Sequence, residues 1–215
     1  ECFTVVYNGA DLTAVENARR TYLPERAAIR ASLGIPEDAV VMLSAARLVK
    51  QKNHQLAIEA LGRLRVRIPN VYLLISGGGP LMEELRTLAR SQGVTDRILL
   101  IGEQRDVFRY YAIADIYLVT STREGFCIAA MEGLAFGMPL ISTRVAGISE
   151  YLEEGKNGFF TSYEPEDVAA KLERAISLPA EAKERMAREA QATAERYSVT
   201  RYGEVINELF TRVLV

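Results

Sequence analysis

Short apolar runs alternate with segments of helical periodicity along most of the chain. The apolar runs are nearly continuous, which is typical of strands that are buried on both faces of a parallel sheet. Helical segments are expected between them, because apolar side chains such as Leu56, Ala60 and Leu64 recur at helical spacing. This pattern predicts strands at 40–46, 71–77, 98–102, 116–121, 139–143 and 158–162.

The helices expected between these strands span 53–68, 80–93, 105–114, 127–136 and 145–155, and those after the last strand span 165–178, 180–197 and 200–215. Strict alternation of strand and helix favours an α/β fold, a Rossmann-like doubly wound parallel sheet of about six strands with C-terminal helices. Such sheets bind ligands at the carboxyl ends of their strands. We therefore expect functional side chains in the loops that follow residues 45, 76, 101, 121 and 143.

Composition narrows the class of protein. The 215 residues are 49% hydrophobic and 25% charged, as in a soluble globular domain, and a net charge of −2 gives no indication of a nucleic-acid partner. Cys2 and Cys127 suggest neither a disulfide scaffold nor a zinc site, so a reducing, cytoplasmic location is expected. No apolar run approaches the ~20 residues of a membrane helix. The chain does not start with Met, so we expect that it begins inside a longer protein.

The segment from Arg123 to Thr143 is the most informative one. It follows a strand-like run, carries Glu124 and Glu132 eight positions apart, and contains Gly137 as a helix terminator. This order predicts a strand, a loop and the start of a helix, where unpaired N–H groups and the positive end of the dipole accept an anion. The two glutamates would then accept hydrogen bonds from a polyhydroxyl ligand, an arrangement that suits a nucleotide sugar.

Three other loops carry weaker signals. Arg47 and Lys52 follow the first strand, where both could reach one anion. Gly78 lies among three glycines after the second strand, but Pro80 rules out the dinucleotide fingerprint, and a tight turn explains the glycines equally well. Gln104 follows the third strand, where it could face a nucleobase or belong to an exposed connection.

Two residues invite a catalytic interpretation that the sequence does not favour. His54 is the only histidine and stands at the start of a predicted helix, where a capping or surface role is expected. Cys127 lies at a predicted helix start, where the pKa of a thiol can fall. No histidine stands near it in the sequence, so a packing role is expected.

Together these motifs resemble the C-terminal, donor-binding domain of retaining glycosyltransferases with the GT-B fold, the large family 4 or group 1. The resemblance covers residues 7–178 and implies that the chain forms one half of a GT-B fold. The matching segments, in the same order as in the family, are YNGADL (7–12), RLVKQK (47–52), GGGP (77–80), the long segment 114–143 with its two glutamates, GISE (147–150) and GKNGFF (155–160).

The resemblance implies a role for each site residue. Arg47 and Lys52 would hold the diphosphate of a nucleoside-diphosphate sugar, Glu124 would face the sugar, and these three would form the catalytic set. Glu132 would accept the ribose hydroxyls. The remaining donor-binding positions would be Gly78, Gln104, Gly125, Phe126, Cys127 and Ile128, the last four through their backbone.

The resemblance also implies how the reaction is organised. No metal ion or other cofactor is expected, and the sugar would be transferred to an acceptor hydroxyl with retention and without a protein nucleophile. Residues 1–215 would form the donor domain, with the helices of 180–215 at its end. The acceptor domain that precedes it in the family would be absent, leaving the isolated chain inactive. A peripheral membrane association of the parent protein through that absent half stays open.

Four positions depart from the common family pattern. Cys127 and Ala130 replace a glycine and a leucine, Gly133 replaces an alanine, and Ala146 replaces a glycine. Two other functions remain open, a binding module without catalysis and a sugar-nucleotide epimerase of the same fold, although the single histidine argues against the epimerase. The sequence does not disclose the base, the sugar or the acceptor.

Overall fold

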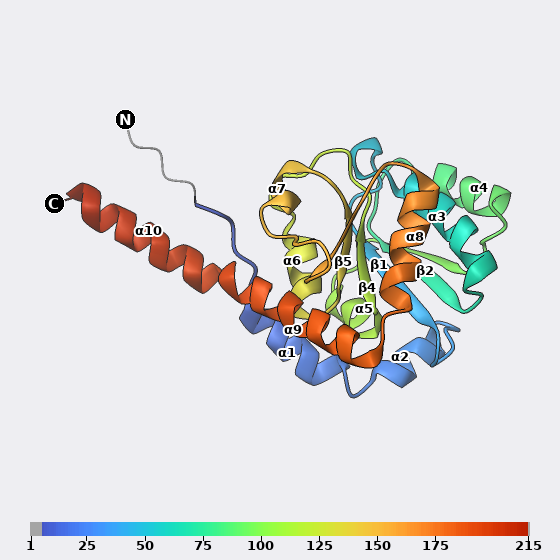
Figure 1. Cartoon of the computed structure of the whole chain (residues 1–215), viewed down its shortest axis with the longest axis horizontal. Coiled ribbons are helices and arrows are strands. Elements are labelled where there is room, and N and C mark those ends of the chain that lie inside the picture. Colours follow the sequence, from blue (N-terminus) through green and yellow to red (C-terminus); the bar gives the residue numbers. More distant parts are fainter. Residues whose placement is uncertain (1–5, 215) are drawn as a thin grey trace.

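The computed structural model describes residues 6–214 of the chain and the side chains up to residue 212 (Figure 1). At its centre lies one six-stranded sheet in which every neighbouring pair of strands is parallel. The strands are β1 (Val40–Ala45), β2 (Val71–Ser76), β3 (Ile98–Gly102), β4 (Ile116–Val119), β5 (Leu140–Thr143) and β6 (Gly158–Thr161). Their order is β3-β2-β1-β4-β5-β6, so the predicted doubly wound, Rossmann-like sheet is confirmed.

Helices cover both faces of the sheet and bury two separate apolar layers. One face carries α3 (His54–Arg67), α4 (Met82–Ser91) and α8 (Pro165–Ile176). The other face carries α1 (Leu12–Tyr22), α2 (Arg26–Ser32), α5 (Phe108–Ile113), α6 (Ile128–Ala135) and α9 (Ala180–Arg196). The short turns η1 (Lys50–Lys52) and α7 (Ala146–Ser149) lie at the carboxyl edge of the sheet, after β1 and β5.

Helices α1 and α2 were not among the predicted elements. Since no strand separates them, the alternating pattern gave no signal for them. They pack on α5, and the buried guanidinium of Arg30 fastens α2 to the turn before β4. Its Nη2 donates to the carbonyl of Ile113 at 2.7 Å and to the carboxylate of Asp115 at 2.8 Å.

The helix predicted over 145–155 is wrong in length, because α7 ends at Ser149. The side chain of Asn157 explains the early end. Its Oδ1 accepts from the amide of Glu153 at 2.8 Å, and its Nδ2 donates to the carbonyl of Tyr151 at 2.8 Å. This side chain thus occupies backbone groups that a longer helix would use.

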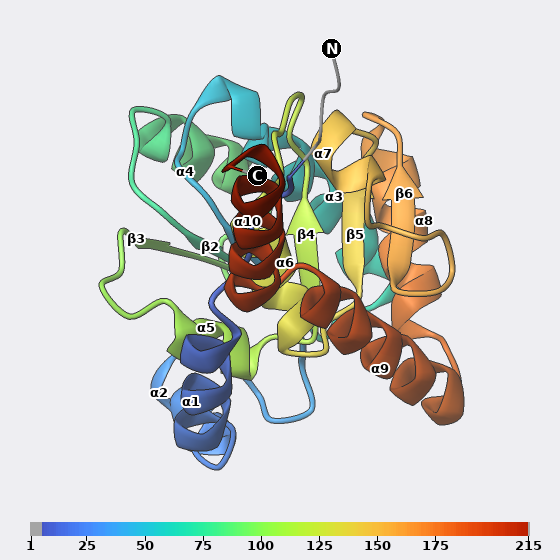
Figure 2. The same cartoon turned by 90° about the vertical axis from the view of Figure 1, so that its left-hand side faces the viewer.

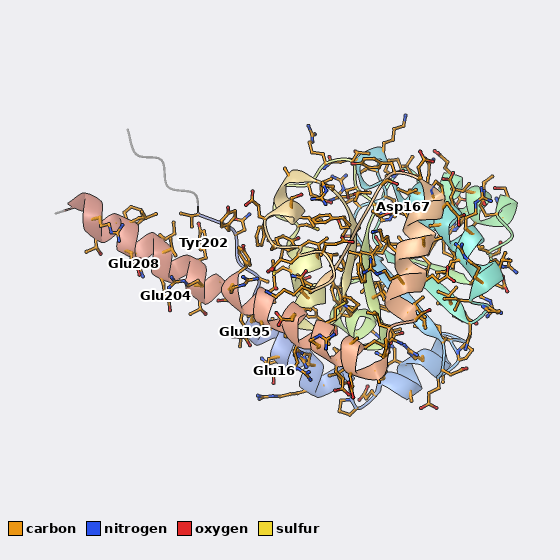
Figure 3. All side chains as sticks on the ribbon, viewed as in Figure 1. Glu16, Asp167, Glu195, Tyr202, Glu204 and Glu208 are labelled. Atoms are coloured by element: carbon orange, nitrogen blue, oxygen red, sulfur yellow. The ribbon has the colours of Figure 1, made fainter. Side chains whose placement is uncertain are left out.

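The segments that enter and leave the sheet domain run side by side. The amide of Ala10 donates to the carbonyl of Tyr197 at 2.9 Å, and the amide of Val199 donates back to the carbonyl of Ala10 at 2.9 Å. After this contact α10 (Val199–Leu214) extends away from the sheet and its covering helices (Figures 1 and 2). Tyr202, Glu204 and Glu208 lie on this extension (Figure 3). None of the helices between residues 6 and 214 combines the length and apolar character that a membrane span requires.

Gly133 in α6 lies directly against the ring of Tyr117 in β4. A Cβ atom at position 133 would come within 2.7 Å of two ring carbons. Tyr117 is almost fully buried, so its ring has little room to move. The tyrosine on β4 therefore explains the glycine on α6, one of the four departures from the family pattern.

We predict that Gly133→Ala destabilises the fold. Alanine gains about 1 kcal/mol over glycine within a helix, whereas forcing a methyl group into a full core costs about 1–3 kcal/mol. The free energy of unfolding from urea titration should therefore fall. In a Tyr117→Leu background the same substitution should cost less or be stabilising. An equal cost in both backgrounds would show that the ring does not require this glycine.

Candidate functional site

A cleft of about 290 Å³ opens where the strand order reverses, between β1 and β4. Its walls come from the loop after β1, the loop after β4 and the first turn of α6. Of the predicted site residues, Arg47, Lys52, Glu124, Cys127 and Ile128 line it. The others lie outside this lining, namely Gly78, Gln104, Gly125, Phe126 and Glu132.

Lys52 and Glu124 form an ion pair in the cleft. Lys52 Nζ lies 2.6 Å from Glu124 Oε1, and the hydroxyl of Ser121 donates to the same oxygen at 2.6 Å. The Glu124 side chain is only 8% exposed, so it is held by two donors rather than by water. Among the described residues no group donates to its second oxygen, Oε2, which leaves that oxygen available for a ligand hydroxyl.

The backbone of the loop after β1 is fixed from β4. The hydroxyl of Thr120 donates to the carbonyl of Asn53 at 2.9 Å, with the carbonyl of Lys52 at 3.2 Å. Asn53 adopts left-handed backbone angles, which end η1 and start α3. Arg47 is exposed on this loop and pairs with no carboxylate in the part of the chain that the structure describes. Its guanidinium is therefore available to an anion in the cleft.

The N-terminus of α6 faces the cleft without a side-chain cap. Cys127 occupies the N-cap position with φ +60° and ψ 72°. Glycine adopts such left-handed angles at no steric cost, so glycine would fit this position without strain. Burial, together with the nearby charge of Glu124, raises the pKa of the Cys127 thiol to about 11. The neutral thiol supports the packing role that the sequence favoured.

A close backbone contact holds the loop before α6. A Cβ atom at Gly147, in α7, would overlap the carbonyl oxygen of Gly125, so only glycine allows this approach. The hydroxyl of Tyr151 donates to the carbonyl of Phe126 at 3.0 Å. The Phe126 ring packs 5.4 Å from the rings of Tyr151 and Tyr197. Its side chain therefore anchors the loop, which leaves its backbone as the part that could meet a ligand.

Glu132 lies one turn further along α6 and is half-buried. Its Oε2 accepts from the hydroxyl of Tyr111 at 3.1 Å. Burial raises the pKa of the Glu132 carboxyl, while the Tyr111 hydrogen bond lowers it. The sequence reading did not single out Tyr111, because a tyrosine in an apolar helical pattern looks like an ordinary core residue.

The loops after β2 and β3 are engaged with the protein itself. The carbonyl of Gly78 accepts from the amide of Leu48 at 2.9 Å, so this glycine turn packs onto the loop after β1. The Gln104 amide donates to the carbonyl of Ile101 at 2.6 Å and accepts from the hydroxyl of Tyr110 at 3.1 Å. The expected contact between Gln104 and a nucleobase would therefore use the second N–H of the Gln104 amide or the second lone pair of its oxygen.

The expectation of a capping or surface role for His54 is wrong. The ring is 2% exposed, and its Nδ1 lies 3.5 Å from the hydroxyl of Ser44. Burial lowers the pKa of His54 to about 4, so the ring is neutral at physiological pH. The signal was present, since His54 stands in phase with Ile58 and Leu61 on the buried side of α3.

Within the described residues, no three His, Cys, Asp or Glu side chains come close enough to hold a metal ion. Positive charge at the cleft comes from the side chains of Arg47 and Lys52 and from the positive end of the α6 dipole. Together they can neutralise an anion of two charges, while Glu124 can accept a hydroxyl beside it.

Comparison with known proteins agrees with this geometry. The family model described as "Glycosyl transferases group 1" matches residues 25–193. The lipopolysaccharide core biosynthesis glycosyltransferase LpsE of Rhizobium meliloti is 33% identical over 149 residues, which are 69% of this chain and 43% of that protein. The D-inositol 3-phosphate glycosyltransferase of Saccharomonospora viridis is 30% identical over 201 residues, which are 88% of this chain and 46% of that protein. The chain thus spans about half the length of these relatives.

A solved structure contains the fold of almost this entire chain. The crystal structure of Anabaena Alr3699/HepE in complex with UDP and glucose superposes with a TM-score of 0.85 at 25% identity. The match covers 97% of this chain and 56% of that one. The family match over most of the chain and the shared fold lead to one conclusion: this chain belongs to the group 1 glycosyl transferases.

Proposed function

We propose that this chain is the donor-binding half of a retaining glycosyltransferase. It binds a nucleoside-diphosphate sugar, and a second domain supplies the acceptor hydroxyl to which the sugar is transferred. The observation that carries the proposal is the cleft at the reversal of strand order, where Arg47, Lys52 and Glu124 meet the uncapped N-terminus of α6. UDP-sugars are the first donors to test, because the similar HepE structure contains UDP and glucose.

The diphosphate fits the cationic side of the cleft. The first N–H groups of α6 have no partner within the helix and lie at the positive end of its dipole. The Lys52 ammonium has three protons and uses one on Glu124, so two remain for phosphate oxygens. Arg47 adds a planar fork that suits phosphate. These groups supply the charge for which other enzymes use a metal ion, so we propose that no metal is required.

The sugar fits beside Glu124. Oε1 of this carboxylate is held by Lys52 and Ser121, so Oε2 can accept a hydroxyl of the donor sugar. A carboxylate held in this way is oriented before the ligand binds, which lowers the ordering cost of binding. Because Lys52 contacts this glutamate and can also contact the diphosphate, it would align the leaving group with the sugar.

Retention without a protein nucleophile is consistent with the side chains of the cleft. Cys127 is neutral at physiological pH, and Glu124 is held through Oε1 by Lys52 and Ser121, while its Oε2 is assigned to a hydroxyl of the sugar. We therefore propose that the acceptor hydroxyl attacks from the face that the diphosphate leaves. The departing phosphate, stabilised by Arg47 and Lys52, would take the proton of the acceptor.

Arg47→Ala should weaken UDP binding by about 10-fold or more, since a hydrogen bond to a charged group contributes about 1.5–3 kcal/mol. Thermal stability should not change, because Arg47 is exposed. Calorimetry at two salt concentrations measures both the loss and its electrostatic origin. Arg63→Ala on the exposed side of α3 is the matched control. Unchanged UDP affinity in Arg47→Ala would remove Arg47 from the phosphate site. Lys52→Ala is less suitable, because it also leaves Glu124 buried without its partner.

Cys127→Gly should retain UDP binding and fold as well as the parent chain, because glycine adopts the left-handed backbone freely. Cys127→Val should lower the free energy of unfolding by about 1–3 kcal/mol, since a β-branched residue is strained there. Chemical denaturation and UDP titration measure both effects. A complete loss of UDP binding in Cys127→Gly would show that the thiol itself takes part in the site.

The chain alone should bind a UDP-sugar but transfer none. The sheet and both of its apolar layers form within residues 6–212, whereas the cleft is open to solvent, so water is not excluded from the donor. UDP release from UDP-glucose, measured with and without a panel of sugar and polyol acceptors, should stay at the uncatalysed rate. Rapid, acceptor-dependent release would contradict the proposed need for a second domain.

A further inference from the structure

Two buried tyrosines lie under the α6 carboxylate Glu132. Tyr111 comes from α5 and Tyr117 from β4, and each is 1% exposed. Their rings stack with centroids 5.5 Å apart and an interplanar angle of 22°. The hydroxyl of Tyr111 lies 3.1 Å from Glu132 Oε2, 3.1 Å from the carbonyl of Ala129 and 3.4 Å from the hydroxyl of Tyr117. The Tyr111 hydroxyl of α5 thus contacts both β4 and α6.

The single proton of each hydroxyl decides how these contacts are used. The Tyr117 hydroxyl lies 3.2 Å from the carbonyl of Ala45 and accepts from the amide of Ala45 at 3.3 Å. Its proton is therefore directed to the end of β1. The proton of Tyr111 goes to Glu132, because an ionised carboxylate is a stronger acceptor than a carbonyl or a phenol oxygen.

We propose that Tyr111 is a positioning residue for nucleotide recognition, which holds Oε2 of Glu132 so that Oε1 faces the ribose hydroxyls of the donor. This inference rests on the proposed donor site and on the role that the family resemblance implies for Glu132, which is to accept the ribose hydroxyls. No group among the described residues donates to Oε1, so this oxygen is free for a ligand. Tyr117 supports the arrangement, because it stacks on Tyr111 and is itself fastened to the backbone of β1.

The arrangement also controls when Glu132 is ionised. Burial raises the pKa of its carboxyl, and the Tyr111 bond opposes this rise. Burial also raises the pKa values of Tyr111, Tyr117 and Cys127, so all three stay neutral between about pH 5 and 8. The charged groups near α6 are Lys52 and Glu124 at its N-terminus and Arg19 of α1, which donates to the Ala135 carbonyl at its other end, while β5 and α9 contribute the apolar Leu140, Ala190 and Ala194. Glu132 is therefore the carboxyl of this cluster whose ionisation depends on the Tyr111 hydrogen bond.

The test compares nucleotides with and without ribose hydroxyls. Calorimetry between pH 5 and 8 measures UDP, GDP and ADP, each beside its 2′,3′-dideoxy form. Wild type should prefer the tightest-binding ribonucleotide over its dideoxy form by about 10-fold or more at pH 8, since charged hydrogen bonds are lost with the hydroxyls. This preference should fall as the pH falls through the pKa of Glu132.

Tyr111→Phe keeps the ring and its stacking but removes the donor. The ribose preference should drop to about 3-fold or less, the dideoxy affinity should stay the same, and the pH at which the preference disappears should rise. Glu132→Gln should lose most of the preference and its pH dependence. Tyr72→Phe is the matched control, because this buried tyrosine lies near the amino end of β2, two strands away from β4, and its hydroxyl accepts from Arg97. A thermal melt of each variant checks folding.

The outcomes separate the inference from the proposed function. If wild type shows no ribose preference, or binds none of the nucleotides, the ribose role of Glu132 is wrong and the inference falls with it. If wild type and Glu132→Gln behave as expected but Tyr111→Phe keeps the full preference and its pH dependence, only the inference is overturned. Equal loss of both nucleotide forms in Tyr111→Phe would show a purely structural tyrosine and also overturn it.

Discussion

The reversal of strand order between β1 and β4 is the constraint on which the site depends. The connection after β1 runs to α3 on one face of the sheet, whereas the connection after β4 runs to α6 on the other face. Because these two connections leave the edge of the sheet in opposite directions, a crevice opens between them. The first turn of α6 and the loop with Arg47 and Lys52 face each other across it.

Contacts between distant loops then fix the crevice. The Lys52–Glu124 pair spans it, and the desolvation of both charges reduces what the pair contributes to folding. The pair instead fixes the orientation of the Glu124 carboxylate, because Oε1 is held by Lys52 and Ser121 while Oε2 can accept from a ligand. Gly147 has a similar effect through the backbone, because its missing side chain lets the Gly125 carbonyl rest on α7. Stability and site geometry therefore come from the same contacts.

The strands and most helices could be predicted because their signals are local: apolar runs such as 71–76 need no knowledge of the fold. Helices α1 and α2 escaped because nothing strand-like separates them, and α7 ended early because Asn157 replaces its backbone partners. At the site, Arg47, Lys52 and Glu124 could be placed at one edge by the topology. The ion pair between Lys52 and Glu124 could not be predicted, because the two residues are 72 positions apart and their contact depends on side-chain rotamers. The burial of His54 was readable from its helical phase but was outweighed by its polar character.

The departure from the family pattern at Gly133 has a physical explanation when it is taken with its neighbours. Gly133 is required by the ring of Tyr117, and that ring supports Tyr111 beside Glu132. Replacing an alanine by glycine in α6 lowers the stability of the helix by about 1 kcal/mol. The stacking of Tyr111 on Tyr117 and the burial of both rings offset this loss. The departure at 133 thus belongs to an interaction that reaches from the end of β1 to the carboxylate of α6. A substitution that looks local in the sequence is one half of a contact between two elements of the site.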